Sequence, residues 1–284
     1  MNKDISVCIS CGPFTEELLP FLFKNIEKTS HNFGRFIFLL GTSPYVSDTK
    51  LKKNLEKYLN SIKFINCKSF DGHKKKCKSF SHASVINELV KHCDTKYSIL
   101  MDPDIAFTYK NWDEIVIEFL TNYKLFGVPY KSFNEDDKLV KYQSIPNAIF
   151  CIGESKLIRS IDWSPHHGLE NYIKTLVSNS NKPFYLETPL KFGIQFISND
   201  KLSTQYNCPI GSYVYLDTGY MATERLSKES VKCLNFVNKN RLFSFDFMIE
   251  EYYLGDKLFL THAKKIRNNS ERYRNWKKVV LNFQ

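Results

Sequence analysis

The sequence has no apolar run long enough to cross a membrane. No window approaches the ~20 consecutive apolar residues that a membrane-spanning helix needs, so we expect any membrane contact to be peripheral. The first residues are polar and lead straight into an apolar strand, without the charged leader and long apolar stretch of a secretory signal. We therefore expect a cytoplasmic protein that is at most peripherally attached to a membrane.

Internal repeats, low-complexity tracts and Gly/Ser-rich linkers are also missing from the sequence. Hydrophobic residues make up 43% of the chain and charged residues 25%, which is usual for a folded protein and excludes long disordered tracts. At 284 residues the chain suits one large α/β domain. We predict one compact unit with a regular half, residues 1–130, and a less regular half, residues 131–284.

The eight cysteines lack the pattern of a metal or redox site. Cys8 and Cys11 form a single CxxC pair, with no second pair and no nearby histidine, so zinc or redox chemistry is not favoured there. Cys8, Cys67 and Cys151 lie in apolar, strand-like runs, where a free thiol acts as a small hydrophobic side chain. A chain of this length needs no disulfides, which favours a reducing compartment.

Acidic residues are too few to balance the basic ones. The chain has 40 Lys and Arg against 30 Asp and Glu, a formal net charge of +10. A basic surface attracts nucleic acid, anionic lipid and phosphorylated small molecules, and charge alone does not choose among them. Aromatic residues, at 15%, are ample for a core and for surfaces on which bases or sugars stack.

The first half alternates apolar strand-like runs with amphipathic helical segments. The predicted strands are 5–11, 35–41, 61–66, 96–101 and 125–128, with helices between them centred on 15–26, 51–59, 84–93 and 112–120. Strands that are apolar on both faces and separated by helices indicate a parallel sheet covered on both sides. The units are too few for a closed barrel, so we predict an open, mostly parallel, Rossmann-like α/β sheet with its ligand site beyond the carboxyl ends of the strands.

The second half is predicted to be irregular α+β structure. We expect a strand over 147–153, a helix over 167–178, a helix over 245–253 and a strand over 257–261 that ends at His262.

Asp102 and Asp104 flank a proline directly after the predicted strand 96–101. Such a pair often forms a turn through side-chain-to-backbone hydrogen bonds. At the end of a buried strand, however, two carboxylates repel and lose solvation unless a cation neutralises them. Oxygen ligands suit Mg²⁺ or Mn²⁺, and Mg²⁺ typically joins one or two carboxylates to substrate phosphates. The pair therefore predicts a cation site that binds a diphosphate.

His262 is a candidate third ligand of the same cation. A lone histidine is most often a surface or core residue. A nitrogen ligand here shifts the preference from Mg²⁺ towards Mn²⁺. Lys265 and Arg267 follow it closely and are candidates to reach phosphate oxygens.

Asp217 is the leading candidate for a general base. It follows an apolar run and precedes Thr218 and Gly219, so it could end a strand facing the site or close a hairpin as an Asx turn. Glu224 is the second candidate.

Two blocks of the first half resemble the family-2 type of GT-A glycosyltransferases. They are 81–90 (SHASVINELV) and 97–105 (YSILMDPDI), and that family has a helix with an asparagine, here Asn87, before a strand that ends in Asp-any-Asp. The opening 5–10, which ends at Ser10, resembles the first, nucleotide-contacting strand. The resemblance covers the chain to about Phe107.

The resemblance implies a nucleotide-diphospho-sugar donor, a divalent metal and inverting transfer by displacement. It puts Asp102 near the ribose and the metal, and Asp104 on the metal and the pyrophosphate. His262 completes the coordination and Asp217 is the base. The regular half is then the nucleotide-sugar-binding half and the other the acceptor-binding half, with the acceptor, whether glycan, lipid-linked or protein, left open.

The chain departs from that family after the second strand, where many members carry acidic residues that bind the nucleotide base of the donor. Residues 40–44 have no acid, and the next is Asp48. Asp71, in a predicted loop after the third strand, is the alternative because ligand sites lie at strand ends.

Two other functions fit parts of the sequence. A nucleotidyltransferase usually has a Gly-rich, basic loop after its first strand, whereas residues 11–15 have one Gly and no cation. A basic binding protein is suggested by Lys74–Lys76 and by 264–278, where Tyr273 and Trp276 interrupt the charges. A solvated terminal helix, or attraction to an anionic membrane, explains that stretch better than nucleic acid does.

Overall fold

A computed structural model gives the fold of the chain. It describes residues 3–12, 15–42, 48–67, 78–129, 139–140, 145–164, 194–196, 198–206, 210–211, 213–215, 218–219, 226, 230–236, 242–243, 246, 248–264, 266 and 269–282.

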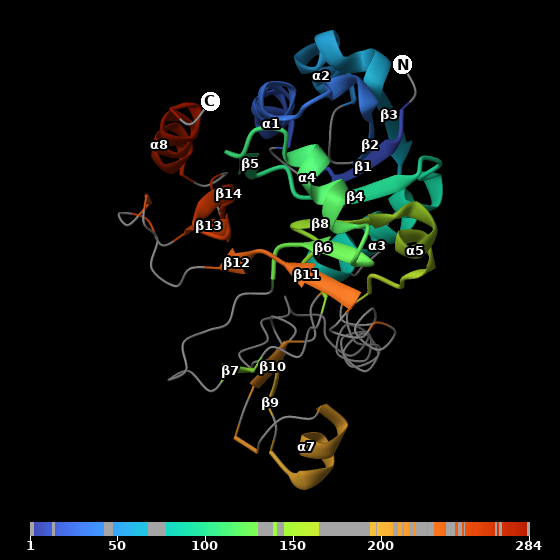
Figure 1. Ribbon diagram of the computed structural model, residues 1–284, viewed down its shortest axis with the longest axis vertical. Helices are drawn as coiled ribbons and strands as arrows, with labels where there is room; N and C mark the ends of the chain where they lie inside the picture. Colours follow the sequence, from blue (N-terminus) through green and yellow to red (C-terminus); the bar gives the residue numbers. More distant parts are fainter. Residues whose placement is uncertain are drawn as a thin grey trace, which may run out of the picture.

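A seven-stranded, mostly parallel sheet forms the centre of the molecule (Figure 1), with the strand order β11-β6-β8-β4-β1-β2-β3. In chain order these strands are β1 Ile5–Ser10, β2 Phe36–Thr42, β3 Ile62–Asn66, β4 Tyr97–Met101, β6 Leu125–Gly127, β8 Phe150–Glu154 and β11 Val231–Cys233. Strand β1 pairs in parallel with β2 and β4, and β8 runs antiparallel to β4 and β6. The predicted open α/β sheet is confirmed, and two of its strands come from the second half of the chain.

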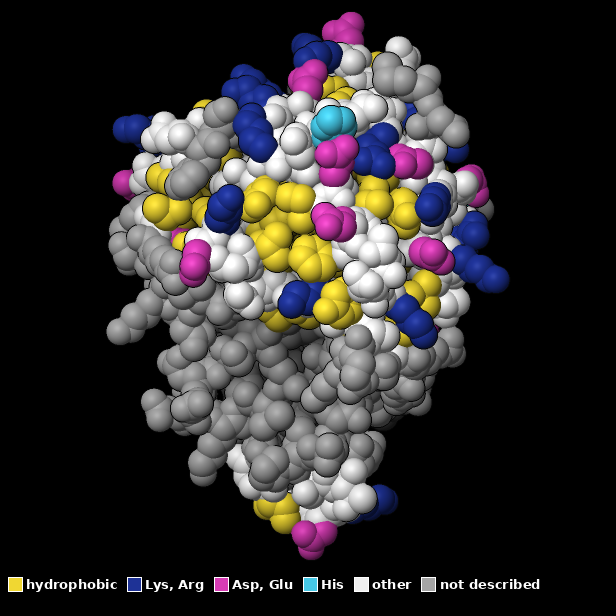
Figure 2. Space-filling view, viewed as in Figure 1, with side chains coloured by type: hydrophobic (Ala, Val, Ile, Leu, Met, Phe, Trp, Pro, Cys, Tyr) yellow, Lys and Arg dark blue, Asp and Glu magenta, His cyan; other side chains and the backbone are white. Residues whose placement is uncertain are grey.

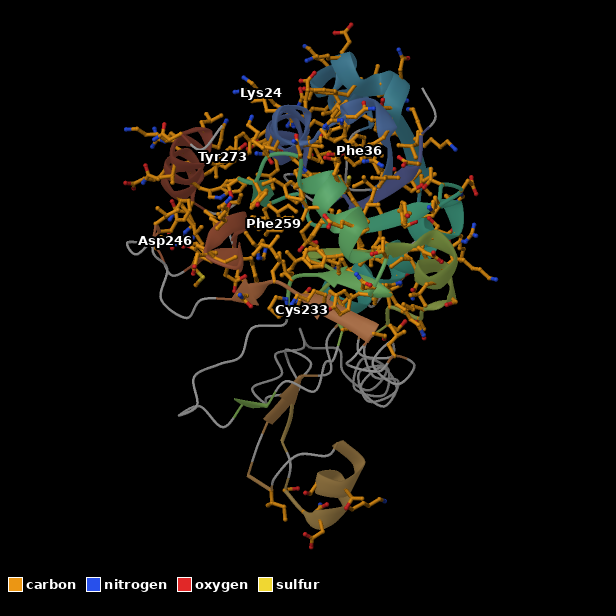
Figure 3. All side chains as sticks on the ribbon, in the orientation of Figure 1. Lys24, Phe36, Cys233, Asp246, Phe259 and Tyr273 are labelled. Carbon is orange, nitrogen blue, oxygen red and sulfur yellow. The ribbon has the colours of Figure 1, made fainter. Side chains whose placement is uncertain are left out.

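Helices cover both faces of this sheet, because its inner strands are apolar on both sides. The helices are α1 Thr15–Thr29, α2 Asp48–Asn54, α3 Lys78–Leu89, α4 Trp112–Phe119 and α5 Ser155–Ser160. Alternate residues of β1 enter different cores: Val7 packs in the cluster with α1, α2 and α4, whereas Cys8 packs with α3 and α5. Phe36 and Phe259, labelled in Figure 3, belong to the first of these cores.

A second, four-stranded sheet lies beside the first and has the order β12-β13-β14-β5. Its strands are β5 Ile105–Phe107, β12 Asn235–Phe236, β13 Ile249–Leu254 and β14 Lys257–Ala263. The C-terminal helix α8, Ser270–Leu281, packs on it, and Trp276 Nε1 donates to Thr261 Oγ1 at 2.8 Å. The sheet therefore brings the end of the chain next to the segment that follows β4.

The remaining elements are short. Strands β7 Leu139–Val140, β9 Ile194–Phe196 and β10 Tyr213–Tyr215 form a three-stranded sheet, and α7 is Asp200–Tyr206. Within the described residues, the 3-10 helices are η1 Phe33–Arg35, η2 Glu56–Ser61 and η3 Val90–His92. No helix in the described part of the chain is long and apolar enough to cross a membrane.

Several local expectations differ from the structure. The predicted helix over 245–253 is wrong, because residues 249–254 form β13 and pair with strands on both sides. The predicted helix over 51–59 breaks after Asn54 and continues as η2, and β5 was not predicted as a strand. The helix predicted over 167–178 lies outside the described residues.

Candidate metal centre

The two aspartates lie in the short turn that joins the two sheets. Strand β4 ends at Met101 and β5 begins at Ile105, so 102–104 pass from the central sheet to the second one. The backbone of this turn is held on both sides. Asp102 N donates to Ile149 O at 2.9 Å, and Ala263 N donates to Asp104 O at 2.9 Å.

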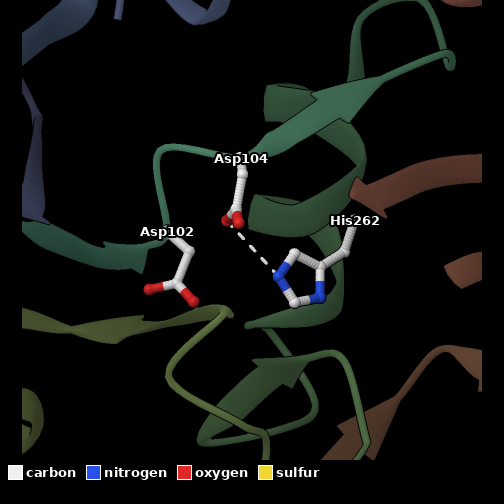
Figure 4. Close-up of side chains that lie close together, drawn as sticks. All are labelled: Asp102, Asp104 and His262. Carbon is white, nitrogen blue, oxygen red and sulfur yellow. Dashed lines mark ion pairs between the residues drawn. The ribbon is translucent and has the colours of Figure 1, made fainter. Parts of the chain in front are cut away.

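Pairing between β14 and β5 brings His262 to this turn. His262 is the register partner of Ile105, the residue directly after Asp104. One ligand atom of each of Asp102, Asp104 and His262 lies within 4.8 Å of the other two. His262 Nε2 is 3.3 Å from Asp104 Oδ1, and Figure 4 shows this contact with both carboxylates directed towards the same space. The three residues predicted as ligands are therefore brought together.

The three side chains differ in exposure in a way that suits a binding site. His262 is nearly buried, with 7% of its side chain exposed, whereas Asp102 and Asp104 keep 21% and 22%. A ligand can thus reach the carboxylates from solvent while the histidine stays fixed. The donor set, two carboxylates and one imidazole, is chemically suited to Mn²⁺ and also to Mg²⁺. Among the described residues this is the one group of three such side chains that could hold an ion.

Behind His262 lies a buried carboxylate, Glu250 on β13. Its Oε2 is 2.9 Å from His262 Nδ1 and accepts from Tyr252 OH at 3.0 Å. Its Oε1 accepts from Lys264 Nζ at 2.5 Å. Glu250 therefore links the imidazole to a lysine and a tyrosine on the same face of the hairpin.

The charged groups of the centre stabilise one another in their ionised forms. Burial opposes the charged form of His262, but Asp104 and Glu250 outweigh it and raise the pKa of His262 to about 10. Burial also opposes ionisation of Glu250, yet His262 and Lys264 lower its pKa to about 2. A cation that coordinates Nε2 must therefore replace a proton on His262.

His82, on α3, was not predicted as part of the centre but lies beside Asp102. Its Nε2 is 3.3 Å from Asp102 Oδ1. Burial tends to raise the pKa of Asp102, and the nearby His82, His262 and Lys264 together lower it. Asp102 is therefore held as a carboxylate between two histidines. His82 lies within the block 81–90, but nothing in that block's pattern singles it out.

The other predicted site residues have different surroundings. Ser10 ends β1, where Ile9 pairs with Met101, so it lies at the same sheet edge as Asp102. The Asn87 amide donates to Asp162 Oδ1 and Ser164 Oγ, both at 3.1 Å, which ties α3 to the segment after α5. Binding of a nucleotide-sugar by Ser10 and Asn87 stays a prediction. Five further candidates lie outside the described residues: Asp71, Asp217, Glu224, Lys265 and Arg267.

No protein-family model and no curated protein matches the chain. Solved structures do match it, with low sequence identity. One is a mannosyltransferase from Pyrobaculum calidifontis in complex with GDP-Man and Mn²⁺ (9% identity, TM-score 0.42), which aligns over 78% of this chain and 56% of its own. Another is the galactosyltransferase LgtC with donor and acceptor sugar analogues (12% identity, TM-score 0.41), over 62% and 66%.

A cytidylyltransferase from Leptospira borgpetersenii is also similar (10% identity, TM-score 0.37), over 63% of this chain and 72% of its own. The chain thus spans just over half of the mannosyltransferase and about two thirds of LgtC. Identities near 10% and TM-scores below 0.5 leave the function to be inferred from the site itself.

Proposed function

We propose that the chain is a metal-dependent glycosyltransferase that moves a sugar from a nucleotide-diphospho-sugar to an acceptor hydroxyl with inversion. The convergence of Asp102, Asp104 and His262 beyond the carboxyl end of β4 carries this proposal. In open α/β sheets, ligands bind beyond the carboxyl ends of the strands. An acid pair there with a nitrogen donor is suited to a cation that also binds a diphosphate.

Each residue of the centre has a distinct part in this proposal. Asp104 and His262 hold the cation, and Asp102 reaches both the cation and the ribose. The cation, when bound, neutralises the charge that develops on the diphosphate leaving group. His82 keeps the Asp102 carboxylate ionised and oriented from the other side of the turn.

The remaining parts of the reaction are assigned from the sequence. Lys265 and Arg267 contact phosphate oxygens, and Ser10, Asn87 and Asp71 contact the nucleoside.

Asp217 accepts the proton of the attacking hydroxyl, and Glu224 is the second candidate for that base. Residues 1–130 form the nucleotide-sugar-binding half. Residues 131–284 form the acceptor-binding half and also supply His262, Lys265 and Arg267 to the donor diphosphate and its cation. Mn²⁺ is favoured over Mg²⁺ because one of the three ligands is a nitrogen.

A thermal-shift panel tests the proposed function. Purified protein is melted with nucleoside diphosphates and nucleotide-sugars, each with Mn²⁺, with Mg²⁺ and with EDTA. A ligand that binds only the folded state stabilises it by about RT ln(1 + [L]/Kd), so at [L] = 100 Kd we expect about 2.7 kcal/mol. The stabilisation should need the metal and should appear for one nucleotide base above the others.

Variants at the two ends of β4 make this test specific. Asp104→Asn should abolish the metal-dependent shift. Asp94→Asn is the matched control, because Asp94 is an exposed aspartate that precedes the same strand. If Asp104→Asn kept the full metal-dependent shift, the metal assignment would be wrong.

The reaction products separate this proposal from nucleotidyl transfer. A glycosyltransferase cleaves the bond between the sugar and the diphosphate, so the sugar joins the acceptor oxygen and a nucleoside diphosphate is released. A nucleotidyltransferase joins a sugar phosphate to a nucleoside triphosphate and releases pyrophosphate. With nucleotide-sugar and Mn²⁺, and water taking the place of the acceptor, we expect nucleoside diphosphate and free sugar. Pyrophosphate released from a nucleoside triphosphate and a sugar phosphate instead would favour the alternative.

A further inference from the structure

Strand β13 carries two adjacent buried glutamates that have different partners. Glu250 is 2% exposed and faces His262, while Glu251 is 0% exposed and faces the segment 242–243. Glu251 Oε1 accepts from the backbone N–H groups of Leu242 and Phe243, each at 2.8 Å. Glu251 thus anchors backbone, whereas Glu250 contacts the side chain of a candidate metal ligand.

The hydrogen-bond donors around Glu250 determine which nitrogen of His262 carries a hydrogen towards Glu250 and which is directed towards Asp104. Lys264 Nζ can only donate, and Tyr252 OH also donates, so the carboxylate acts as an acceptor towards both. His262 Nδ1, at 2.9 Å from Oε2, must then carry a hydrogen. Nε2 is left as the nitrogen directed towards Asp104.

An irregularity in the hairpin puts these two residues opposite each other. Leu254 pairs with Lys257 and Tyr253 with Leu258, but the register then shifts, so Tyr252 pairs with Leu260. Without that shift Glu250 would pair with Thr261, and His262 would point to the other face of the sheet. β-Bulges of this kind are frequent next to functional sites, where they redirect a side chain.

We infer that Glu250 is the positioning residue of the metal centre, holding His262 with Nδ1 protonated so that Nε2 serves as the ligand. This inference rests on the proposed function and deepens it. Carboxylates that accept from the second nitrogen of a ligating histidine fix its tautomer and ring orientation and raise its basicity. Lys264 and Tyr252 keep Glu250 in place.

Mn²⁺ binding to the full-length protein, without nucleotide, tests this role directly. Free Mn²⁺ is measured by electron paramagnetic resonance for wild type, Glu250→Ala, Glu250→Gln and Glu251→Gln. Loss of such an outer carboxylate typically weakens metal binding by about 10- to 100-fold, which we expect for Glu250→Ala. Glu250→Gln should lose less, because its carbonyl oxygen still accepts from Nδ1.

Glu251→Gln is the matched control on the same strand. It removes an equally buried charge and is expected to lower the melting temperature, yet to leave Mn²⁺ affinity unchanged at temperatures where the protein is folded. A purely structural role for Glu250 would make the two glutamine variants alike in Mn²⁺ affinity. If Glu250→Ala does not fold, Glu250→Gln against Glu251→Gln decides the question.

A spectroscopic readout reports on the tautomer itself. In protein with ¹⁵N-labelled histidine and diamagnetic Cd²⁺, the imidazole shifts of His262 should show hydrogen on Nδ1 and metal on Nε2. Glu250→Gln should broaden or mix this pattern, because an amide can either donate or accept. An unchanged pattern together with unchanged Mn²⁺ affinity would overturn the inference.

The outcomes keep the two proposals apart. If wild type binds Mn²⁺ and Asp104→Asn abolishes binding while both Glu250 variants keep it, only the role of Glu250 is refuted. If wild type does not bind Mn²⁺ at all, the metal-dependent function is refuted and the role of Glu250 is refuted with it.

Discussion

Asp113, in the first turn of α4, is a carboxylate whose side chain has no exposed surface. Arg35 Nη1 donates to its Oδ2 at 3.2 Å, and His31 N donates to Oδ1 at 2.6 Å. Arg35 also binds the half-buried Asp4 through Nε and Nη2. One guanidinium therefore joins the N-terminus, the segment before β2 and the start of α4.

Removal of Arg35 should be strongly destabilising, because it leaves a buried charge without its cation. We expect Arg35→Ala to lower the free energy of unfolding by about 3–5 kcal/mol, measured by urea denaturation. Asp4→Asn is the control, because the Arg35–Asp4 ion pair is more exposed and should contribute no more than about 1 kcal/mol to the free energy of unfolding. Equal losses in the two variants would contradict this account of Asp113.

At the scale of single residues, the sequence was informative where a side chain follows a buried strand. Asp102, Asp104 and His262 were predicted on that basis, and they come together. Glu250 could not be predicted, because its place opposite His262 depends on a register shift that no local pattern reveals. Asn87 was predicted to bind the nucleotide-sugar, whereas the side-chain hydrogen bonds that the structure shows for it are to residues 162–164.

At the scale of elements, the central sheet depends on one close backbone approach. A Cβ placed on Gly127 of β6 would lie 2.1 Å from Phe150 O of β8 and 2.8 Å from Pro146 Cβ. Neither neighbour is the end of a flexible side chain, so the strands would have to separate. The pairing of β6 with β8 therefore leaves no room at this position even for the methyl group of alanine.

Gly127→Ala should destabilise the protein by about 1–3 kcal/mol or more, as overpacked cores do. Gly12→Ala is the control, since a Cβ there meets no atom within 4 Å. Thermal or urea unfolding of both variants measures the difference. A Gly127→Ala variant as stable as Gly12→Ala would mean that β6 and β8 are not packed as described.

Helix α8 supports the strand that carries His262. Trp276 is fully buried, lies 5.2 Å from the ring of Phe21, and donates to Thr261, the residue before His262. Figure 3 shows α8, with Tyr273 labelled, beside the β13–β14 hairpin.

Trp276→Ala should cost about 3–5 kcal/mol of stability. It should also speed hydrogen exchange along β14, because the helix no longer covers that strand. Asn275→Ala, at an exposed neighbouring position, should do neither. Fast exchange confined to α8, with β14 unaffected, would show that the helix does not support the metal centre.

The elements differ in how far the sequence predicts them. Strands β1, β2 and β4 are apolar on both faces and were predicted closely, because they are buried on both sides. Strands β5 and β13 were missed or assigned as helix, because short or aromatic runs acquire their structure from pairing partners far along the chain. The sheet that completes the site was therefore not predicted.

At the scale of the whole molecule, the described basic residues on the face seen in Figure 2 form no single patch. Lys and Arg side chains there are interspersed with Asp and Glu. Among the described residues of that face, the basic charge is therefore dispersed, within a chain whose formal net charge is +10. Such attraction is screened by salt over about 8 Å at physiological ionic strength.

This distribution predicts weak, salt-sensitive binding to nucleic acid. In a gel-shift assay, complexes with random oligonucleotides should disappear between 50 and 200 mM salt, on the order of the range in which phosphate contacts weaken. Metal-dependent nucleotide binding should survive, because its charges lie in a partly buried site. A salt-resistant oligonucleotide complex without any nucleotide binding would favour the basic binding protein.

The most direct test of the central claim is an anomalous diffraction measurement on crystals grown with Mn²⁺ and a nucleoside diphosphate, with data collected at the manganese edge. The account predicts one strong peak within bonding distance of Asp104 and His262 Nε2, with Asp102 at its side and the diphosphate on its open face. Bound nucleotide without a manganese peak there, or a peak elsewhere in the molecule, would contradict it.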